Sequence, residues 1–326
     1  MYKIIDENGT TYTLYEYDGE SEFESMIIDN SEAIFGGEGI YFAMKKLIAI
    51  VLALVLCLSL TACGGSSDSA SDDAAAEDAA TEETVVLNVA ASATPHAEIL
   101  EQCVAPLAEQ GIELKVNVYG DYVVPNTAVE EGSEDANYFQ HVPYLDTFNA
   151  ENGTELVSVA MVHYEPFGIY PGTKSAIADL AEGDKIAIPN DGSNRARGLL
   201  LLEQEGIIGL KDGAGMEATV LDIDENPLNL EIFEMEAAQI AGVRDSVALA
   251  VINGNYALQA GLNAGTDALA VEDAASISAT TYANVLVVKA GNENAEKIQA
   301  LVNALKSDAV KTYINDTYSG AVVPIF

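Results

Sequence analysis

From residue 85 onward, short apolar runs of strand length alternate with longer segments of helical periodicity, and this alternation constrains the fold most strongly. Repeated strand-then-helix patterns predict α/β layers, and a chain of 326 residues is long enough for one large or two medium domains, so we expect two lobes. The predicted strands are 85–91, 113–119, 155–162, 185–189, 219–223 and 246–252. The predicted helices are 95–110, 194–204, 236–241, 256–260, 294–306 and 309–317.

Residues 44–63 have the layout of a secretory signal. Two lysines precede fourteen uncharged, mostly apolar residues, 47–60, which are followed by small residues and Cys63. This run is shorter than the ~20 apolar residues that a membrane-spanning helix needs, so a cleaved signal peptide is favoured over an uncleaved membrane anchor. The ending Leu60-Thr-Ala-Cys63 resembles the lipobox of bacterial lipoproteins, whose cysteine carries lipid such as palmitate and becomes the mature N-terminus. We therefore expect an extracytoplasmic domain that is lipid-anchored to the cell membrane.

The segments on either side of this signal are acidic. Residues 1–43 contain ten acidic residues and one lysine, which is unlike the positive start of a signal peptide. We therefore expect Met44 to be the true start and 1–43 to be a mis-assigned upstream extension. Residues 64–84 are Ser, Gly, Ala, Thr and acids without an aromatic residue, a composition that predicts a disordered acidic tether.

Charge and cysteine content exclude several classes of protein. Fourteen basic against 52 acidic residues give a net charge of −38, which argues against nucleic acid as a partner. Cys103 is the only cysteine after the signal, so the domain cannot form an internal disulfide. Because Cys103 lies in a helical pattern, we expect it to be a buried apolar residue and not a nucleophile.

Signatures of catalysis are missing from the sequence. It has no phosphate-binding loop, no Gly-x-Ser-x-Gly elbow, no His-Glu-x-x-His and no Cys-x-x-Cys, so we predict neither an enzyme such as a surface hydrolase nor a cofactor. A receptor for zinc or another metal remains an alternative, with His96, His141, His163 and Glu98 as ligands, although their spacing matches no known zinc signature. Because the sequence has no ATP-binding loop, a partner would have to supply the energy for any ATP-driven process.

Three stretches have the composition of an amino-acid site. Residues 135–145 combine Phe139, His141 and Tyr144 with amides, as binding pockets do, although a strand running into a helix with core aromatics gives the same pattern. Arg197 lies in the first turn of a predicted helix, where a guanidinium matches a carboxylate. Asn253 follows an apolar strand, at the end where α/β sheets place ligands, although Asn-Gly is equally a turn signal.

These stretches and their neighbours resemble the methionine-binding lipoprotein (NlpA-type) family, the substrate-binding components of methionine ABC importers. The resemblance extends over residues 85–326. Its motifs are Asp121-Tyr-Val-Val-Pro-Asn126, Asp135-Ala-Asn-Tyr-Phe-Gln-His-Val-Pro-Tyr-Leu145, Glu165-Pro-Phe-Gly-Ile169, Ile188-Pro-Asn-Asp191 with Arg197-Gly-Leu-Leu-Leu-Leu202, Glu225-Asn-Pro227, and Ala250-Val-Ile-Asn253 with Tyr256-Ala257.

The resemblance implies a two-lobed type II periplasmic-binding-protein fold that closes on one amino acid. Residues 85–163 and 282–326 would form the first lobe, and 164–281 the second. It implies that Arg197 binds the α-carboxylate and that an ABC permease with its ATPase receives the ligand. The remaining ligand contacts that it implies are Tyr122, Phe139, His141 and Tyr144 around the side chain, and Asn194 and Asn253 as polar partners.

Two departures from the family pattern bear on ligand identity. An additional arginine, Arg195, lies near the carboxylate site, and the first strand-to-helix turn, 91–96, is shorter than usual. L-methionine is the predicted ligand, with D-methionine and a methionine-containing dipeptide as alternatives.

Overall fold

The structure is a computed structural model that describes residues 3–5, 11–13, 84–272 and 278–326. Two compact units are present, Met1–Asp78 and Ala79–Phe326. In the first unit, the described residues form an antiparallel pair of β1 (Lys3–Ile5) and β2 (Thr11–Thr13). The signal predicted at 44–63, and nearly all of the extension and tether predicted around it, lie outside the described residues. None of the described helices combines the length and apolar character needed to cross a membrane.

A six-stranded sheet forms the first lobe of the second unit. The strand order is β15-β6-β14-β5-β3-β4. Strand β3 runs parallel to its neighbours β4 and β5, whereas β14 runs antiparallel to its neighbours β5 and β6. The strands are β3 (Val85–Ala91), β4 (Ile112–Val118), β5 (Ala136–His141), β6 (Leu156–Tyr164), β14 (Ala283–Lys289) and β15 (Val323–Pro324). The predicted strands at 85–91, 113–119 and 155–162 are confirmed within one or two residues.

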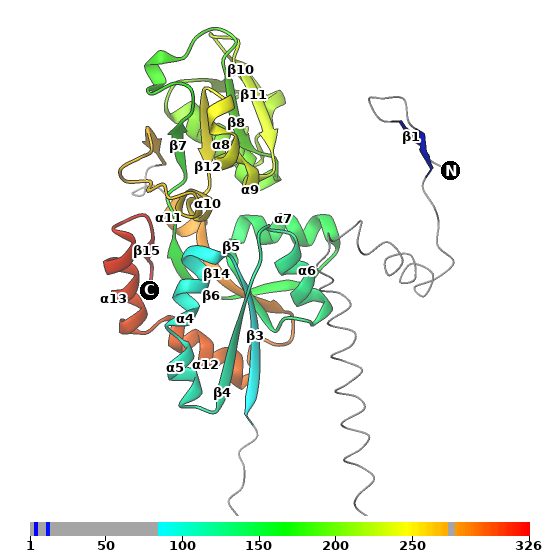
Figure 1. Ribbon diagram of the computed structural model, residues 1–326, viewed down its shortest axis with the longest axis vertical. Coiled ribbons are helices and arrows are strands. Elements are labelled where there is room, and N and C mark those ends of the chain that lie inside the picture. The colour runs from blue at the N-terminus through cyan, green and yellow to red at the C-terminus, as the bar shows by residue number, and fades with distance from the viewer. Residues whose placement is uncertain (1–2, 6–10, 14–83, 273–277) are drawn as a thin grey trace, which may run out of the picture. The chain divides into compact units, whose positions relative to one another are not determined.

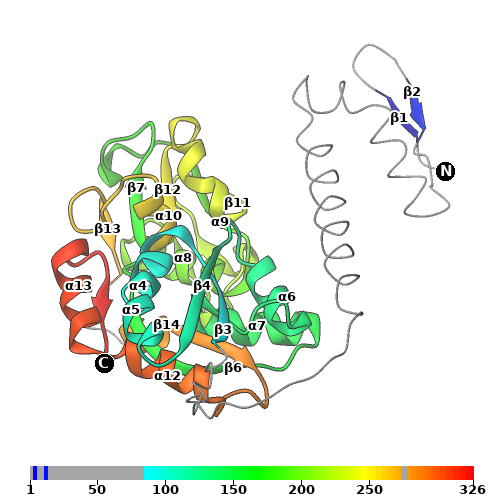
Figure 2. The ribbon, with the colours of Figure 1, turned by 60° about the horizontal axis from the view of Figure 1, so that its bottom comes forward.

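Helices cover both faces of this sheet (Figure 2). On β14, Leu286 and Val288 face one core cluster while Val285 and Val287 face another, because successive side chains of a strand point to opposite faces. Packed on the first face are η1 (Ala93–Ala97), α4 (Glu98–Glu101), α5 (Val104–Ala108), α12 (Glu296–Leu305) and α13 (Asp308–Tyr318). Packed on the second face are α6 (Val124–Glu131) and α7 (Val142–Asn152).

The helix predicted at 95–110 is not continuous, since η1, α4 and α5 divide this segment into short pieces. Cys103 lies between α4 and α5 and is fully buried in the first core cluster. Burial raises the pKa of its thiol to about 12, and a thiol that stays protonated is a poor nucleophile. The prediction of a buried cysteine is confirmed.

The second lobe contains a five-stranded sheet of order β11-β8-β12-β7-β13. Its strands are β7 (Gly168–Pro171), β8 (Lys185–Pro189), β11 (Glu231–Met235), β12 (Leu249–Ile252) and β13 (Ala270–Val271), and its main helices are α8 (Gly192–Gln204), α9 (Ala237–Ile240) and α10 (Gly254–Gln259). Shorter elements are η2 (Ile177–Asp179), β9 (Gly209–Leu210), η3 (Gly215–Glu217), η4 (Val220–Asp222), β10 (Ile223–Glu225), η5 (Ala241–Ser246) and α11 (Ser278–Thr281).

One predicted strand of this lobe is wrong. Most of 219–223 forms the short helix η4, because Thr219 and Asp222 make a reciprocal capping box in which the Asp222 carboxylate accepts a hydrogen bond from the Thr219 backbone N–H at 3.0 Å. The apolar residues of this segment suggested a strand, but the polar residues on either side determine the local structure.

The two α/β lobes are connected by two crossings of the chain (Figure 1). The chain leaves the first sheet at Tyr164 and enters the second at Gly168, and it returns between Val271 and Ala283. The predicted two-lobed α/β architecture is confirmed.

Candidate ligand-binding site

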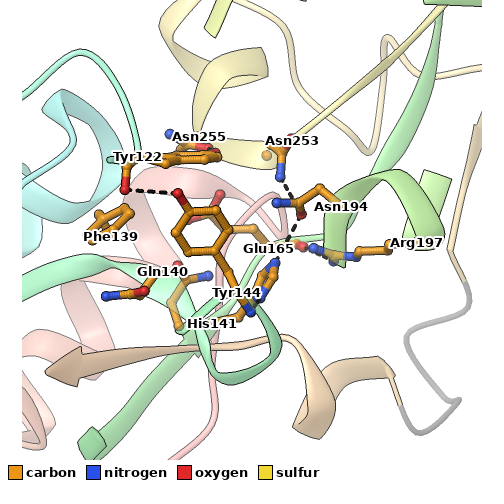
Figure 3. A pocket seen from close by; sticks show the side chains of 12 residues that line it. Tyr122, Phe139, Gln140, His141, Tyr144, Glu165, Asn194, Arg197, Asn253 and Asn255 are labelled. Atoms are coloured by element: carbon orange, nitrogen blue, oxygen red, sulfur yellow. Dashed lines mark hydrogen bonds between the residues drawn. The ribbon is translucent and has the colours of Figure 1, made fainter. Parts of the chain in front are cut away.

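A cavity between the two lobes brings together all seven predicted ligand contacts. Tyr122, Phe139, His141 and Tyr144 come from the first lobe, and Asn194, Arg197 and Asn253 from the second (Figure 3). Every one of them except Tyr122 is at least nine-tenths buried. The cavity therefore has an aromatic wall on one lobe and a polar wall on the other.

The aromatic wall is built by the end of β5, the start of α7 and the segment just before α6, which carries Tyr122. The ring of Tyr122 lies 5.7 Å from that of Phe139 and 5.6 Å from that of Tyr144, centroid to centroid. The Tyr144 hydroxyl donates a hydrogen bond of 3.0 Å to the backbone carbonyl of Tyr122, which fixes both rings. Such a surface of aromatic faces and edges suits an apolar or thioether side chain.

His141 connects this wall to the second lobe. It is the N-cap of α7, where its Nδ1 accepts a 3.2 Å hydrogen bond from the backbone N–H of Tyr144. The proton of the neutral ring therefore lies on Nε2, which donates to Asn194 Oδ1 at 3.0 Å. Burial and the nearby charge of Arg197 lower the pKa of His141 to about 3, so the ring is neutral near pH 7.

The start of α8 positions Asn194. Asp191 caps this helix by accepting a 2.9 Å hydrogen bond from the Asn194 backbone N–H. The same Asn194 Oδ1 that accepts from His141 also accepts from Asn253 Nδ2 at 2.9 Å. The chain His141–Asn194–Asn253 therefore spans the cavity from lobe to lobe (Figure 3).

Arg197 projects from the first turns of α8 into the back of the cavity. Its Nε donates to Glu272 Oε2 at 2.9 Å and its Nη2 donates to Glu272 Oε1 and, at 3.1 Å, to the Glu165 carbonyl. The guanidinium carbon lies 4.2 Å from the ring centroid of Tyr282 and 4.8 Å from that of Phe167. None of the hydrogen bonds within the described residues uses Nη1.

Glu272 maintains the charge of Arg197. Burial alone would lower the pKa of this guanidinium, but the Glu272 carboxylate raises it above its usual value. Burial alone would likewise raise the pKa of Glu272, but Arg197 brings it below the usual value for a glutamate. Arg197 and Glu272 are therefore both ionised near pH 7. The hydrogen bonds between them are charge-assisted, and such bonds are stronger than those between neutral groups.

Comparison with known proteins identifies the family of this chain. A model of the family described as NlpA lipoprotein matches residues 87–326. The chain belongs to the NlpA lipoprotein family.

Three relatives illustrate this membership. The methionine-binding lipoprotein MetQ of Bacillus subtilis is 39% identical over 286 residues, which are 86% of this chain and 99% of the relative. A lipoprotein structure from Ruminococcus gnavus has a TM-score of 0.73 and 60% identity, covering 74% of this chain and 99% of its own. The structure of a nutrient-binding protein from Burkholderia cenocepacia bound to methionine has a TM-score of 0.70 and 41% identity. The match covers 74% of this chain and 100% of the Burkholderia chain.

Family membership establishes the fold and the functional class of this protein. The fold is the two-lobed type II periplasmic-binding-protein fold of these relatives. The relatives are lipoproteins and binding proteins, and this NlpA-family chain is a solute-binding protein and not an enzyme.

Sequence reasoning missed five residues that also line the cavity. These are Gln140, Glu165, Gly254, Asn255 and Asn284. Gln140 lies within the stretch 135–145, and Asn255 lies two residues after Asn253. The Tyr122 hydroxyl donates to Asn255 Oδ1 at 2.6 Å. Glu165 lay in a family motif without an assigned role. Asn284 is the second residue of the apolar strand β14, where the sequence gives no signal of a site.

Arg195 does not belong to the site. Its Nη1 lies 3.4 Å from Glu234 Oε1, and both side chains are about one-quarter exposed. It is absent from the cavity lining. The additional charge that the sequence places near the carboxylate site therefore balances a surface acid.

The four residues of the metal alternative do not come together. His96 and His163 meet Glu165 behind the cavity, with one ligand atom from each within 4.8 Å of the others. His141 instead lines the cavity, and the Glu98 carboxylate accepts hydrogen bonds from Thr94 and Tyr318. That set of ligands is therefore wrong.

Proposed function

We propose that this lipoprotein captures methionine, with L-methionine as the expected form, and delivers it to an ABC permease driven by its ATPase. One observation carries the proposal: a buried arginine and a wall of aromatic rings line one cavity between two lobes. Relatives named methionine-binding and D-methionine-binding lipoproteins support it, as does the neighbour bound to methionine. D-methionine and a methionine-containing dipeptide are the alternatives.

In this proposal, the aromatic wall holds the thioether chain and Arg197 binds the α-carboxylate. Tyr122, Phe139, His141 and Tyr144 supply the wall, and Asn194 and Asn253 complete the polar contacts. Lobe I (85–163 and 282–326) and lobe II (164–281) both contribute, so ligand contacts are complete only when the lobes are closed. Binding therefore stabilises the closed state.

Isothermal titration tests this proposal. The full chain, purified in detergent and refolded to remove bound ligand, is titrated with L-methionine, D-methionine and Gly-Met. We expect one-to-one binding of L-methionine, tighter than that of the other two. Tighter binding of D-methionine or Gly-Met would select that alternative, and no heat from any of the three would contradict a methionine receptor.

We also propose that lipid on Cys63, palmitate included, anchors the domain at the extracytoplasmic face of the cell membrane. The lipobox-like sequence and the lipoprotein names of the relatives support this anchor. In cells fed labelled palmitate, the wild-type chain is expected to take up label and sediment with membranes. Cys63→Ser is expected to lose the label, whereas Cys103→Ser, the matched control, keeps it. Equal labelling of Cys63→Ser would contradict the anchor.

A further inference from the structure

Helix α10 of the second lobe lies at the junction between the lobes (Figure 1) and contacts the first lobe outside the ligand cavity. The Tyr256 hydroxyl donates a hydrogen bond of 3.3 Å to the backbone carbonyl of Gly120, and Asn255 Nδ2 donates to Ser92 Oγ at 3.4 Å. Of these four residues, Asn255 lines the cavity and the other three do not. The hydrogen bond of Tyr256 therefore joins the lobes without touching the proposed ligand.

The two first-lobe partners of α10 follow neighbouring parallel strands. Ser92 comes directly after β3 and Gly120 comes two residues after β4, and β3 pairs with β4 in parallel. The carboxyl ends of parallel strands lie at the same edge of a sheet, so both loops meet α10 at this edge. One turn of a helix thereby contacts two separate loops of the opposite lobe.

Apolar side chains cross the lobe boundary in both directions. Leu258 of α10 packs against the first core cluster, which belongs to the first lobe. Tyr122 of the first lobe packs against a second-lobe cluster that includes Ile252 and Tyr256, and its ring centroid lies 4.9 Å from that of Tyr256. Because burial of apolar surface needs no ligand, these contacts favour closed lobes by themselves.

We propose that Asn255, Tyr256 and Leu258 form a latch that stabilises the closed lobes with or without a bound ligand, so that the receptor closes part of the time before it binds. Stabilising the closed state in this way raises the affinity for every ligand by one common factor. Tyr256 and Leu258 are therefore positioning residues, which set how often the two halves of the site come together. The latch goes beyond the proposed function, because it requires two closing lobes but no particular ligand.

Distances between two spin labels test the latch on refolded, ligand-free protein. Labels at Glu151→Cys and Glu217→Cys report opening, because these two exposed residues line one groove between α7 and η3 of opposite lobes. Cys57 and Cys63 are replaced by serine in the full chain, and Cys103 is fully buried and stays unlabelled. We expect ligand-free wild type to show a closed and an open population, and methionine to convert the open population to the closed one.

Tyr256→Phe removes one hydroxyl from the latch and keeps the ring. We expect the closed-to-open ratio of the ligand-free protein to fall about fivefold, the effect of one hydrogen bond. Affinities for L-methionine, D-methionine and Gly-Met, measured for those that bind, are expected to fall by one common factor of at most about fivefold. Ser92→Ala removes the acceptor of Asn255 and is expected to lower the ratio as well.

Tyr119→Phe is the matched control. The Tyr119 hydroxyl donates to Glu134 Oε1 at 2.9 Å within the first lobe, so this variant also loses a tyrosine hydrogen bond, but one that does not join the lobes. We expect its closed-to-open ratio and its affinities to equal those of wild type. Thermal unfolding checks that each variant is folded.

The outcomes separate the latch from the proposed function. Ligand-free wild type without a closed population would overturn the latch, and so would a Tyr256→Phe ratio equal to that of wild type. Affinity losses that differ between ligands by more than about threefold would also overturn it, because they would assign Tyr256 to ligand selection. If Tyr256→Phe does not fold, the wild-type populations and the Ser92→Ala ratio decide. Wild type that closes but binds none of the three ligands would overturn the proposed function and keep the latch.

Discussion

Arg197→Ala is expected to lower the affinity for methionine by at least about 100-fold. The side chain is 5% exposed and its guanidinium lies over two aromatic rings, so the substitution removes a buried partner of the ligand carboxylate. Truncating one member of a buried, hydrogen-bonded charge pair across an interface costs about 2–5 kcal/mol, and every 1.4 kcal/mol is a tenfold change in affinity.

The same substitution also affects folding, because it leaves Glu272 as a buried charge without its partner. Such a loss costs about 3–5 kcal/mol in the free energy of unfolding. The double variant Arg197→Gln with Glu272→Gln removes both charges, so we expect it to unfold at a higher temperature than Arg197→Ala while still failing to bind. Thermal unfolding and titration of the same samples separate the two effects.

Arg195→Ala is the matched control on the same helix. Its partner Glu234 is partly exposed, and ion pairs of this kind contribute about 0–1 kcal/mol. We expect unchanged methionine affinity and little change in stability. An Arg197→Ala affinity within threefold of wild type, or a loss in Arg195→Ala as large as in Arg197→Ala, would place the carboxylate elsewhere.

Local sequence signals predicted the parts of the site that lie within one continuous stretch. Phe139, His141 and Tyr144 lie within six residues, at the junction of β5 and α7, so their chemistry and their shared position can be inferred together. The proposed carboxylate-binding role of Arg197 was inferred in the same way, from its position in the first turn of a predicted helix. In each case, the residue type and the local structure are encoded by immediate neighbours.

The missed parts depend on contacts between distant residues. Glu165 becomes part of the site because Gly254, 89 positions later, has no side chain to displace it. Glu272 balances Arg197 from 75 positions away. No periodicity or motif in the sequence encodes such pairings. They become visible only in the three-dimensional structure, where these distant residues come into contact.

The histidines predict a second large effect, a loss of stability in mild acid. The chain has three histidines, and burial lowers their pKa values to about 4 for His96, about 3 for His141 and about 3 for His163. An unfolded histidine has a pKa of about 6.5. Between about pH 6.5 and pH 4, the unfolded chain therefore binds more protons than the folded chain, and the free energy of unfolding decreases as the pH falls.

Each histidine contributes a slope of about 1.4 kcal/mol per pH unit within this window, so the three together approach about 4 kcal/mol per unit. Glu165 opposes this effect, because burial raises its pKa and the folded state takes up that proton more readily. Acid also relieves the repulsion within a chain of net charge −38. We expect stability to be nearly constant from pH 8 to 7 and to decrease steeply below about pH 6.

His96→Gln tests whether buried histidines cause this loss. The Nε2 of His96 lies 2.9 Å from Asn284 Oδ1, and a glutamine amide can donate in its place without titrating. Urea unfolding from pH 7 to pH 4.5 is expected to show a slope about one-third smaller in the variant, because one of three protons is no longer taken up on unfolding. Identical slopes would assign the acid sensitivity to other groups, whereas a smaller slope shows that keeping His96 neutral beside Glu165 limits the pH range in which the closed fold is stable.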